Sequence, residues 1–201
     1  MSFNIVSLFE NKIAELFGSK YAVAVDCCTH GLELALRYTN ADRIKVPTHT
    51  YLSIPMLADK LNIQRMWKEE EWEKYYYITS NIIDAATLWE ADSYVKGTFM
   101  VLSFQFKKHL SLGRGGMILT DDIEAWEALK RMSYDGRVPE TDEPWAVQDI
   151  DSIGYHYYMT PETAHTGIQK LENKEFQDKL GRIWNYQDYP NLMNFKIFKN
   201  G

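Results

Sequence analysis

Residues 98–120 of this 201-residue chain read TFMVLSFQFKKHLSLGRGGMILT, two short apolar runs separated by a basic loop that ends in glycines. The runs predict strands at about 98–104 and 116–120, because β-branched and aromatic side chains favour pleated, half-buried backbone. Further strands are expected at 21–25, at 43–46 and at 75–78 or 81–83, with helices near 29–38 and 53–61. This alternation predicts a three-layer α/β/α fold around a mixed, mostly parallel sheet.

The remaining segments predict helices near both ends of the chain. Ser7 and Glu10 have capping-box spacing ahead of an apolar periodicity that stops at Gly18, which predicts an opening helix. Asp121-Asp122 predict the start of a helix that ends near Met132, and Thr160-Pro161 predict one that runs to about Leu171. Residues 134–152 are expected to form a long surface loop and residues 186–201 an irregular tail, within a single domain over 1–201.

Composition argues against several classes of protein. The chain has 22 Lys and Arg against 28 Asp and Glu, giving a net charge of −6. It has no block of basic residues of the kind that binds nucleic acid, so a nucleic-acid partner is not expected. No apolar run approaches the roughly 18 residues that a membrane span needs, and the amino terminus lacks the pattern of a secretory signal. Cys27 and Cys28 are adjacent, a poor geometry for a disulfide, so a reducing, cytoplasmic setting is expected. With His30 they lack the usual zinc spacing, and no metal is expected.

Polar residues follow the predicted strands where ligands bind in α/β sheets, beyond the carboxyl ends. Lys108 lies in the basic loop, and Asp84 ends an apolar strand. A lysine amine, an acid and a phosphate cradle are what pyridoxal phosphate needs from a protein. Taken alone, Lys107-Lys108-His109 is explained as well by a solvated turn, and Asp84 by a helix cap.

Five motifs in one order support the first explanation. They are Cys27-Cys28-Thr29, Pro47-Thr48-His49-Thr50-Tyr51, Asp84-Ala85-Ala86, the loop from Ser103 to Gly116, and Gly154-Tyr155-His156-Tyr157-Tyr158-Met159-Thr160. The set resembles the DegT/StrS family of pyridoxal-phosphate-dependent sugar aminotransferases, from about residue 8 to about residue 172. The resemblance implies the large domain of the aspartate aminotransferase fold (fold type I), with the small carboxyl-terminal domain largely absent.

The resemblance also implies roles for eight residues. Counting from Ser103 and back from Gly113 makes Lys108 the Schiff-base lysine, and Asp84 matches the acid that faces the pyridine nitrogen. The other implied cofactor contacts are Cys28, where the family has Gly; Thr29 and Ser103, at the phosphate; Tyr51, stacked on the ring; Thr87, near the ring hydroxyl; and His156, which replaces an Asn that reaches the phosphate of a neighbouring subunit. Simpler explanations remain for three of them: a helix cap for Thr29, an exposed strand-end hydroxyl for Ser103 and a core side chain for Tyr51.

The activity that the resemblance implies is transfer of an amino group from an amino acid, glutamate in the family, to a keto sugar nucleotide. A homodimer is the expected assembly, with the segment 154–158 approaching the partner's site. Two alternatives remain open at this point: a pyridoxal-phosphate-dependent dehydratase on the same scaffold, and a non-catalytic homologue with a binding or assembly role. Because the chain is short for the family, cofactor binding is better supported than turnover.

Overall fold

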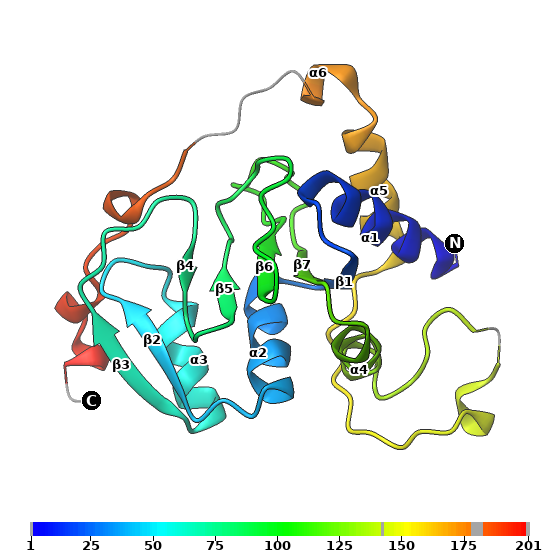
Figure 1. The fold of residues 1–201 in the computed structure, drawn as a ribbon, viewed down its shortest axis with the longest axis horizontal. Helices are drawn as coiled ribbons and strands as arrows, with labels where there is room; N and C mark the ends of the chain where they lie inside the picture. The colour runs from blue at the N-terminus through cyan, green and yellow to red at the C-terminus, as the bar shows by residue number, and fades with distance from the viewer. Residues whose placement is uncertain (1, 142, 178–182, 200–201) are drawn as a thin grey trace.

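A computed structural model of the chain describes residues 2–141, 143–177 and 183–199 (Figure 1). The described strands are β1 (Tyr21–Val25), β2 (Arg43–Pro47), β3 (Gln64–Lys68), β4 (Tyr76–Tyr77), β5 (Ile82–Asp84), β6 (Phe99–Ser103) and β7 (Gly116–Thr120). The described helices are α1 (Asn4–Phe17), α2 (Cys28–Tyr38), α3 (Ser53–Leu61), α4 (Ile123–Ser133), α5 (Pro161–Leu171) and α6 (Lys174–Gln177). Short 3-10 turns lie at Trp145–Val147, Tyr186–Asp188, Leu192–Asn194 and Lys196–Phe198.

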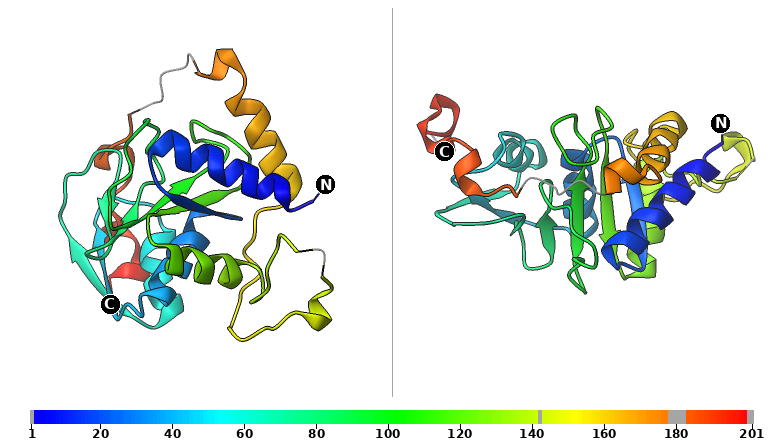
Figure 2. Two further views of the ribbon diagram at one scale, coloured as in Figure 1. Left: turned by 45° about the vertical axis from the view of Figure 1, so that its right-hand side comes forward. Right: turned by 90° about the horizontal axis from the view of Figure 1, so that it is seen from above.

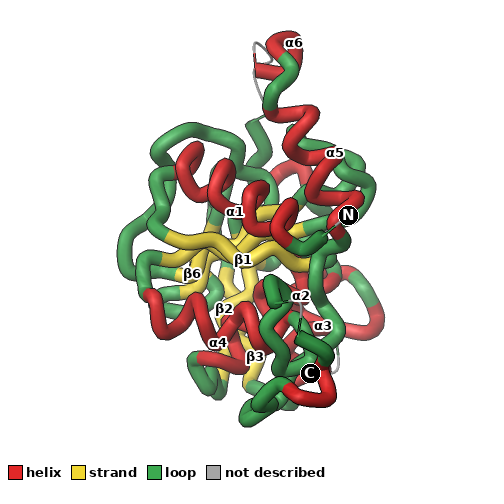
Figure 3. Tube along the Cα trace, turned by 90° about the vertical axis from the view of Figure 1, so that its right-hand side faces the viewer, coloured by secondary structure: helices red, strands yellow, loops and turns green. Residues whose placement is uncertain are grey.

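Helices cover both faces of the main sheet, whose strand order is β1-β7-β6-β5-β4. On β1 the side chains alternate: Val23 and Val25 share a core with residues of α2 and α4, whereas Ala22 and Ala24 share one with residues of α1 and α5. Figure 3 shows α1 and α4 on opposite sides of β1, and Figure 2 shows α5 beside α1. The expected α/β/α layering is therefore confirmed.

The expectation of a mostly parallel sheet is wrong. Among the described strands of the main sheet, β5 and β6 pair in parallel, whereas β1–β7, β6–β7 and β4–β5 pair antiparallel. The physical reason is the connection between β6 and β7. Parallel neighbours require a crossover connection, which is usually a helix, and residues 104–115 contain no described helix. The second predicted unit instead forms a separate two-stranded parallel sheet of β2 and β3.

The start of α1 differs from the predicted capping box. The helix begins at Asn4, so Ser7 and Glu10 both lie inside it. The Ser7 hydroxyl donates to Glu140 Oε1 at 2.8 Å, and Glu10 Oε1 accepts the backbone N–H of Ala24 at 2.7 Å. Both side chains therefore make tertiary contacts, which the local spacing could not reveal.

The other predicted helix ends are confirmed. Gly18 ends α1 with φ of 78°, Asp122 accepts backbone N–H groups at the start of α4, and Thr160 caps α5 ahead of Pro161. Each cap satisfies backbone groups that a helix end leaves without an intrahelical partner. α3 spans 53–61 as expected, which places its first turn beside that of α2.

The two segments without predicted pattern follow different courses. The described part of 134–152 leaves the sheet as a long loop with a single short turn at Trp145–Val147, seen at the lower right of Figure 1. Residues 184–198 instead lie along the two-stranded sheet. Their backbone is anchored by hydrogen bonds from Lys74 N–H to Trp184 O (2.8 Å) and from Leu192 N–H to Thr48 O (2.8 Å). None of the described helices is long and apolar enough for a membrane span. The single-domain assignment stays a prediction.

Candidate functional site

A pocket of about 670 Å³ opens beyond the ends of β1, β5 and β6. Of the eight predicted site residues, seven line it: Cys28, Thr29, Tyr51, Asp84, Thr87, Ser103 and Lys108. A second hollow of about 330 Å³ shares Thr87, Ser103 and Lys108 with it and continues toward Trp89 and His109. The structure thus brings together residues that are separated by up to 80 positions in the sequence.

Asp84 ends β5 and is buried in the wall of this pocket. Its Oδ1 accepts the backbone N–H of Ala86 at 3.0 Å and lies 3.9 Å from the Cys28 sulfur; its Oδ2 accepts the Tyr76 hydroxyl at 2.5 Å. Burial raises the pKa of Asp84, because a low-dielectric environment disfavours the charged form, although the Tyr76 hydrogen bond acts in the opposite direction. Asp84 is therefore a buried acid built into a site, not a helix cap.

Lys108 and Lys107 occupy different environments despite being neighbours. Lys108 is partly buried, with its Nζ 5.2 Å from the centre of the Trp184 ring, a cation–π contact. Burial lowers the pKa of Lys108, and the nearby Asp84 carboxylate opposes that effect. The Lys107 side chain is exposed and lies over Phe106. Lys108, the lysine that the motif register selects, is therefore the more shielded of the two amines.

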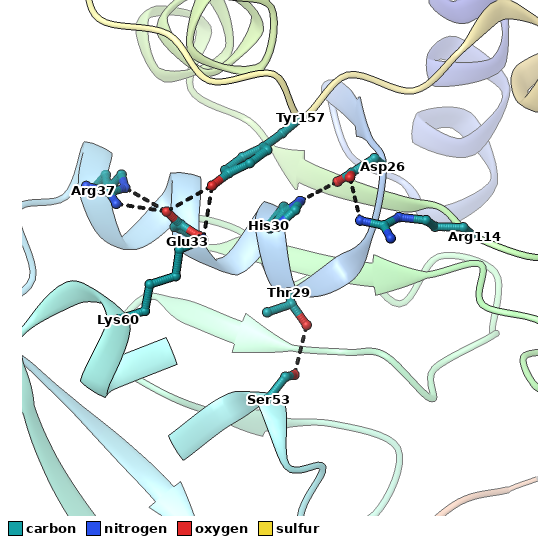
Figure 4. Close-up of polar contacts among 9 residues, drawn as sticks. All are labelled: Asp26, Thr29, His30, Glu33, Arg37, Ser53, Lys60, Arg114 and Tyr157. Atoms are coloured by element: carbon teal, nitrogen blue, oxygen red, sulfur yellow. Dashed lines mark hydrogen bonds and ion pairs between the residues drawn. The ribbon is translucent and has the colours of Figure 1, made fainter. Parts of the chain in front are cut away.

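The first turn of α2 lies at the pocket, with free backbone N–H groups of the kind that bind anions. Thr29 Oγ1 lies 2.8 Å from Ser53 Oγ at the start of α3, a hydroxyl pair visible in Figure 4. β7 approaches this turn closely at Gly116, where a Cβ atom would lie 2.6 Å from Cys27 C and Cys28 N. The helix start therefore depends on a residue without a side chain at 116.

A charged group lies beside the same turn, at the end of β1. Asp26 Oδ1 is 2.6 Å from His30 Nδ1, and its Oδ2 is 2.7 Å from an Arg114 nitrogen (Figure 4). The hydrogen bond to Asp26, helped by one with Cys27 and opposed by burial, raises the pKa of His30 to about 9.

A metal is disfavoured at this group. Asp26, Cys27 and His30 offer ligand atoms within 4.8 Å of one another, but the raised pKa of His30 favours its protonated form, and the two Asp26 oxygens already contact His30 and Arg114. Cys28 lies apart from the group, because its sulfur is directed to Asp84.

Tyr51 and Thr87 line the pocket in different ways. Tyr51 is 61% exposed, so the alternative of a core tyrosine is wrong and its ring is free at the pocket wall. The Thr87 hydroxyl donates to the Lys74 carbonyl at 2.6 Å and is therefore oriented before any ligand arrives. Ser103 is half-buried at the end of β6, where its oxygen accepts the Gln105 N–H at 3.4 Å.

His156 is the one predicted residue outside the pocket. Its side chain is 70% exposed, and Nδ1 lies 3.0 Å from Asp135 Oδ2. The segment around it crosses the end of β1, where Asp26 N–H donates to Tyr157 O. An exposed His156 is compatible with the expected role across a dimer, which stays a prediction.

Pocket residues that the sequence analysis assigned to no motif include Trp72, Tyr76, Trp184, Asp188 and Tyr189. Tyr76 had a partial signal, because the tyrosine run at 75–77 was a predicted strand that could pair with the one ending at Asp84. The register Tyr76↔Asp84 is set by tertiary structure. The last three had no signal at all: Asp188 and Tyr189 belong to the tail without a pattern, and Trp184 lies just before it.

Comparison with known proteins adds the family context. The model of the DegT/DnrJ/EryC1/StrS aminotransferase family matches residues 2–77 and 94–193 of this chain. An uncharacterized protein of Methanocaldococcus jannaschii is 22% identical over 240 aligned residues, which cover 92% of this chain and 62% of that protein.

Solved structures share the fold at low identity. AtS13 from Actinomadura melliaura is 20% identical with a TM-score of 0.76, over 89% of this chain and 62% of that one. The sugar aminotransferase CalS13 from Micromonospora echinospora is 15% identical with a TM-score of 0.71, over 84% and 60%. PseC of Helicobacter pylori, an aminotransferase involved in the biosynthesis of pseudoaminic acid, is 16% identical with a TM-score of 0.64, over 84% and 57%. This chain spans less than two thirds of the length of these relatives.

Proposed function

This chain belongs to the DegT/DnrJ/EryC1/StrS aminotransferase family, and on that premise we propose that it is a pyridoxal-phosphate-dependent aminotransferase of small molecules. The proposed donor is an amino acid, glutamate in the first instance, and the proposed acceptor is a keto sugar nucleotide. One observation carries the proposal: a buried carboxylate, Asp84, and an amine of lowered pKa, Lys108, line the same pocket. A cytoplasmic setting, expected from the two free cysteines, is part of the proposal.

The residues that line the pocket fit pyridoxal phosphate. When bound, this cofactor supplies an aldehyde carbon for the amine and an electron-withdrawing pyridine ring. Lys108 would hold the aldehyde carbon, Asp84 the ring nitrogen, and the first turn of α2 with Thr29 the phosphate. Tyr51 offers an exposed aromatic face to a flat ring. Cys28 departs from the glycine of the family, and its sulfur lies 3.9 Å from Asp84 Oδ1.

The chain's own groups have the properties that proton transfer requires. The lowered pKa of Lys108 increases the share of neutral amine at neutral pH, so that Nζ can accept a proton from a bound substrate and later return it. The Trp184 ring covers the same Nζ from the side of the carboxyl-terminal segment, which limits its contact with water. Asp84 accepts hydrogen bonds from the Tyr76 hydroxyl and the Ala86 N–H, which hold it as a fixed acid at the pocket wall.

Covalent trapping tests the cofactor assignment. The chain is incubated with pyridoxal phosphate and reduced with borohydride, which makes a lysine–cofactor bond permanent, and the labelled peptide is identified by mass spectrometry. We expect the label on Lys108, lost in Lys108→Ala and retained in the matched control Lys107→Ala. A label that follows Lys107 would contradict the register, and a chain that takes no label would overturn the proposal in favour of a non-catalytic homologue.

Turnover needs a separate test, because less than two thirds of the relatives' length is present. Glutamate added without a keto acceptor is expected to change the visible absorption of the bound cofactor, as the first half of an amino transfer requires. Asp84→Asn is expected to keep part of the cofactor and lose nearly all of this reaction. A different result would favour a dehydratase: the cofactor binds, its absorption does not change with glutamate, and the protein eliminates water from a sugar nucleotide.

A further inference from the structure

Tyr76 and Asp84 lie directly opposite each other on the paired strands β4 and β5. Both side chains are buried, and the Tyr76 hydroxyl lies 2.5 Å from Asp84 Oδ2. The Thr50 hydroxyl contacts the Tyr76 oxygen from the other side. A carboxylate only accepts hydrogen bonds and a tyrosine has one proton to donate. With Asp84 ionised, Thr50 therefore donates to Tyr76, and Tyr76 donates to Asp84.

The Asp84 carboxylate has limited acceptor capacity left. A carboxylate offers about four lone-pair positions. Described groups occupy one position on each oxygen: Ala86 N–H on Oδ1 and Tyr76 on Oδ2. The Cys28 thiol has one proton and lies 3.9 Å from Oδ1 and 3.7 Å from the Val101 carbonyl oxygen. The second position on Oδ2 therefore remains for a donor in the pocket, which is what a single protonated ring nitrogen needs.

Tyr76 also opposes the effect of burial on this acid. Burial raises the pKa of Asp84, and the Tyr76 hydrogen bond is the largest of the influences that lower it, ahead of the Ala86 N–H. A hydrogen bond to an ionised group is stronger than one between neutral groups. Loss of the Tyr76 hydroxyl should therefore shift Asp84 further toward its neutral form.

We propose that Tyr76 is a positioning residue that fixes the Asp84 carboxylate through Oδ2 and favours its ionised form, with Thr50 orienting the Tyr76 hydroxyl. The group that Asp84 would then hold is a protonated heteroaromatic nitrogen, and in this respect the inference rests on the proposed function. The ring of Tyr76 packs against Trp72 with centres 5.0 Å apart. Tyr76→Phe keeps that packing and removes the hydroxyl alone.

The first test uses the chain without cofactor. The free energy of unfolding is measured by chemical denaturation from pH 4 to pH 8 for the wild type, Tyr76→Phe and the matched control Tyr75→Phe. The folded-state pKa of Asp84 is raised, so its contribution to stability is largest at low pH and is lost as pH rises through that pKa. We expect this loss to move to higher pH in Tyr76→Phe, to move less in the same direction in Thr50→Val, and to stay in place in Tyr75→Phe.

Other titrating groups near Asp84 are controlled by the design. They are Cys28 from α2, Tyr76 itself, and Lys108 from the loop after β6. Burial raises the pKa of Cys28 and of Tyr76 well above the usual range, and Lys108 is common to all the variants. In an Asp84→Asn background, Tyr76→Phe should not change the pH at which stability is lost. Superimposable curves for Tyr76→Phe and the wild type would overturn the proposal.

A second readout follows the cofactor by absorption. Tyr76→Phe is expected to weaken pyridoxal phosphate binding by about tenfold, the effect of one charge-assisted hydrogen bond, and to change the pH dependence of the bound spectrum, while Tyr75→Phe matches the wild type. Absence of cofactor binding in the wild type would count against the proposed function and leave the first test valid. An unchanged titration in the first test would overturn the role of Tyr76 even if the cofactor binds.

Discussion

His30 Nδ1 lies 2.6 Å from Asp26 Oδ1, and the same imidazole stacks on Tyr157 with ring centres 3.7 Å apart. One side chain of α2 therefore connects the end of β1 with the segment that follows the long loop (Figure 4). Because Asp26 also pairs with Arg114, the loop that carries Lys108 is tied into the same group.

This contact predicts a loss of stability with rising pH. The pKa of His30 is raised to about 9 by the hydrogen bonds with Asp26 and Cys27, against burial. The stabilisation is fully present below the unfolded pKa of 6.5 and is lost as pH rises through about 9. Because the pair is partly exposed and solvent-screened, we expect a decline of about 1–2 kcal/mol over this range, measured by chemical denaturation. His30→Gln should lack the decline, and parallel curves for the two proteins would contradict the prediction.

A buried ion pair between α1 and α4 predicts a larger cost. Lys130 Nζ lies 2.9 Å from Glu10 Oε2, both side chains being buried, and it also pairs with Glu140. Lys130→Met leaves the Glu10 charge buried without its partner, so we expect a loss of about 3–5 kcal/mol in the free energy of unfolding. Lys12→Met, at the exposed pair with Glu172, should cost less than about 1 kcal/mol. Equal costs for the two variants would show that burial does not strengthen the first pair.

Gly116 predicts an effect on cofactor binding through backbone position. Gly116→Ala places a Cβ against the Cys27–Cys28 peptide, which must shift, at a cost of about 1–3 kcal/mol in stability. The shift moves the N–H groups proposed to hold the phosphate, so pyridoxal phosphate affinity should fall as well. Gly97→Ala is the control: its φ of 75° makes alanine unfavourable by roughly 1–2 kcal/mol, yet nothing lies within 4 Å of the added atom. That control should keep the wild-type affinity; a similar loss in both variants would argue against a local effect at α2.

His156 predicts a shared site if the chain forms the proposed homodimer. The exposed side chain lies in a segment that also exposes Trp145 and Ile153, residues of the kind that interface cores contain. We expect a dimer by sedimentation, and an approximately tenfold weaker cofactor affinity in His156→Ala, the effect of one charge-assisted hydrogen bond, without loss of fold. His165→Ala, on α5, is the control. A monomer that binds pyridoxal phosphate tightly would contradict the shared site and leave the assignment of Lys108 intact.

The sequence predicts the elements of this fold better than their arrangement. Caps such as Asp122 and Thr160 are local, so residue type and spacing were sufficient to find them. Strand direction depends on how the chain returns to the sheet, and the loop from 104 to 115 carries no local sign that it replaces a crossover helix. Strand β3 was missed because Gln64–Lys68 is only partly buried and lacks an apolar run.

The candidate site was predictable where motif order fixed it and not where distant segments meet. Seven motif-derived residues line one pocket, although five of them had a simpler local explanation. Glu10 shows the limit: its spacing from Ser7 indicated a cap, whereas its partners are Ala24 and Lys130. Tyr76 reaches the pocket because of the register between β4 and β5. Trp184 reaches it because the carboxyl-terminal segment packs beside the pocket. No short sequence pattern encodes either arrangement.

The docked tail has a consequence for the order in which this protein matures. Trp184, Asp188 and Tyr189 are the last residues of the pocket to be synthesised, and their segment pairs with residues made more than a hundred positions earlier. While the ribosome still holds these residues, the emerging sheet and helices can fold, but Lys108 lacks the ring that covers it. Acquisition of a ligand in this pocket is therefore expected to wait until these residues have left the ribosome, after the rest of the sheet has formed.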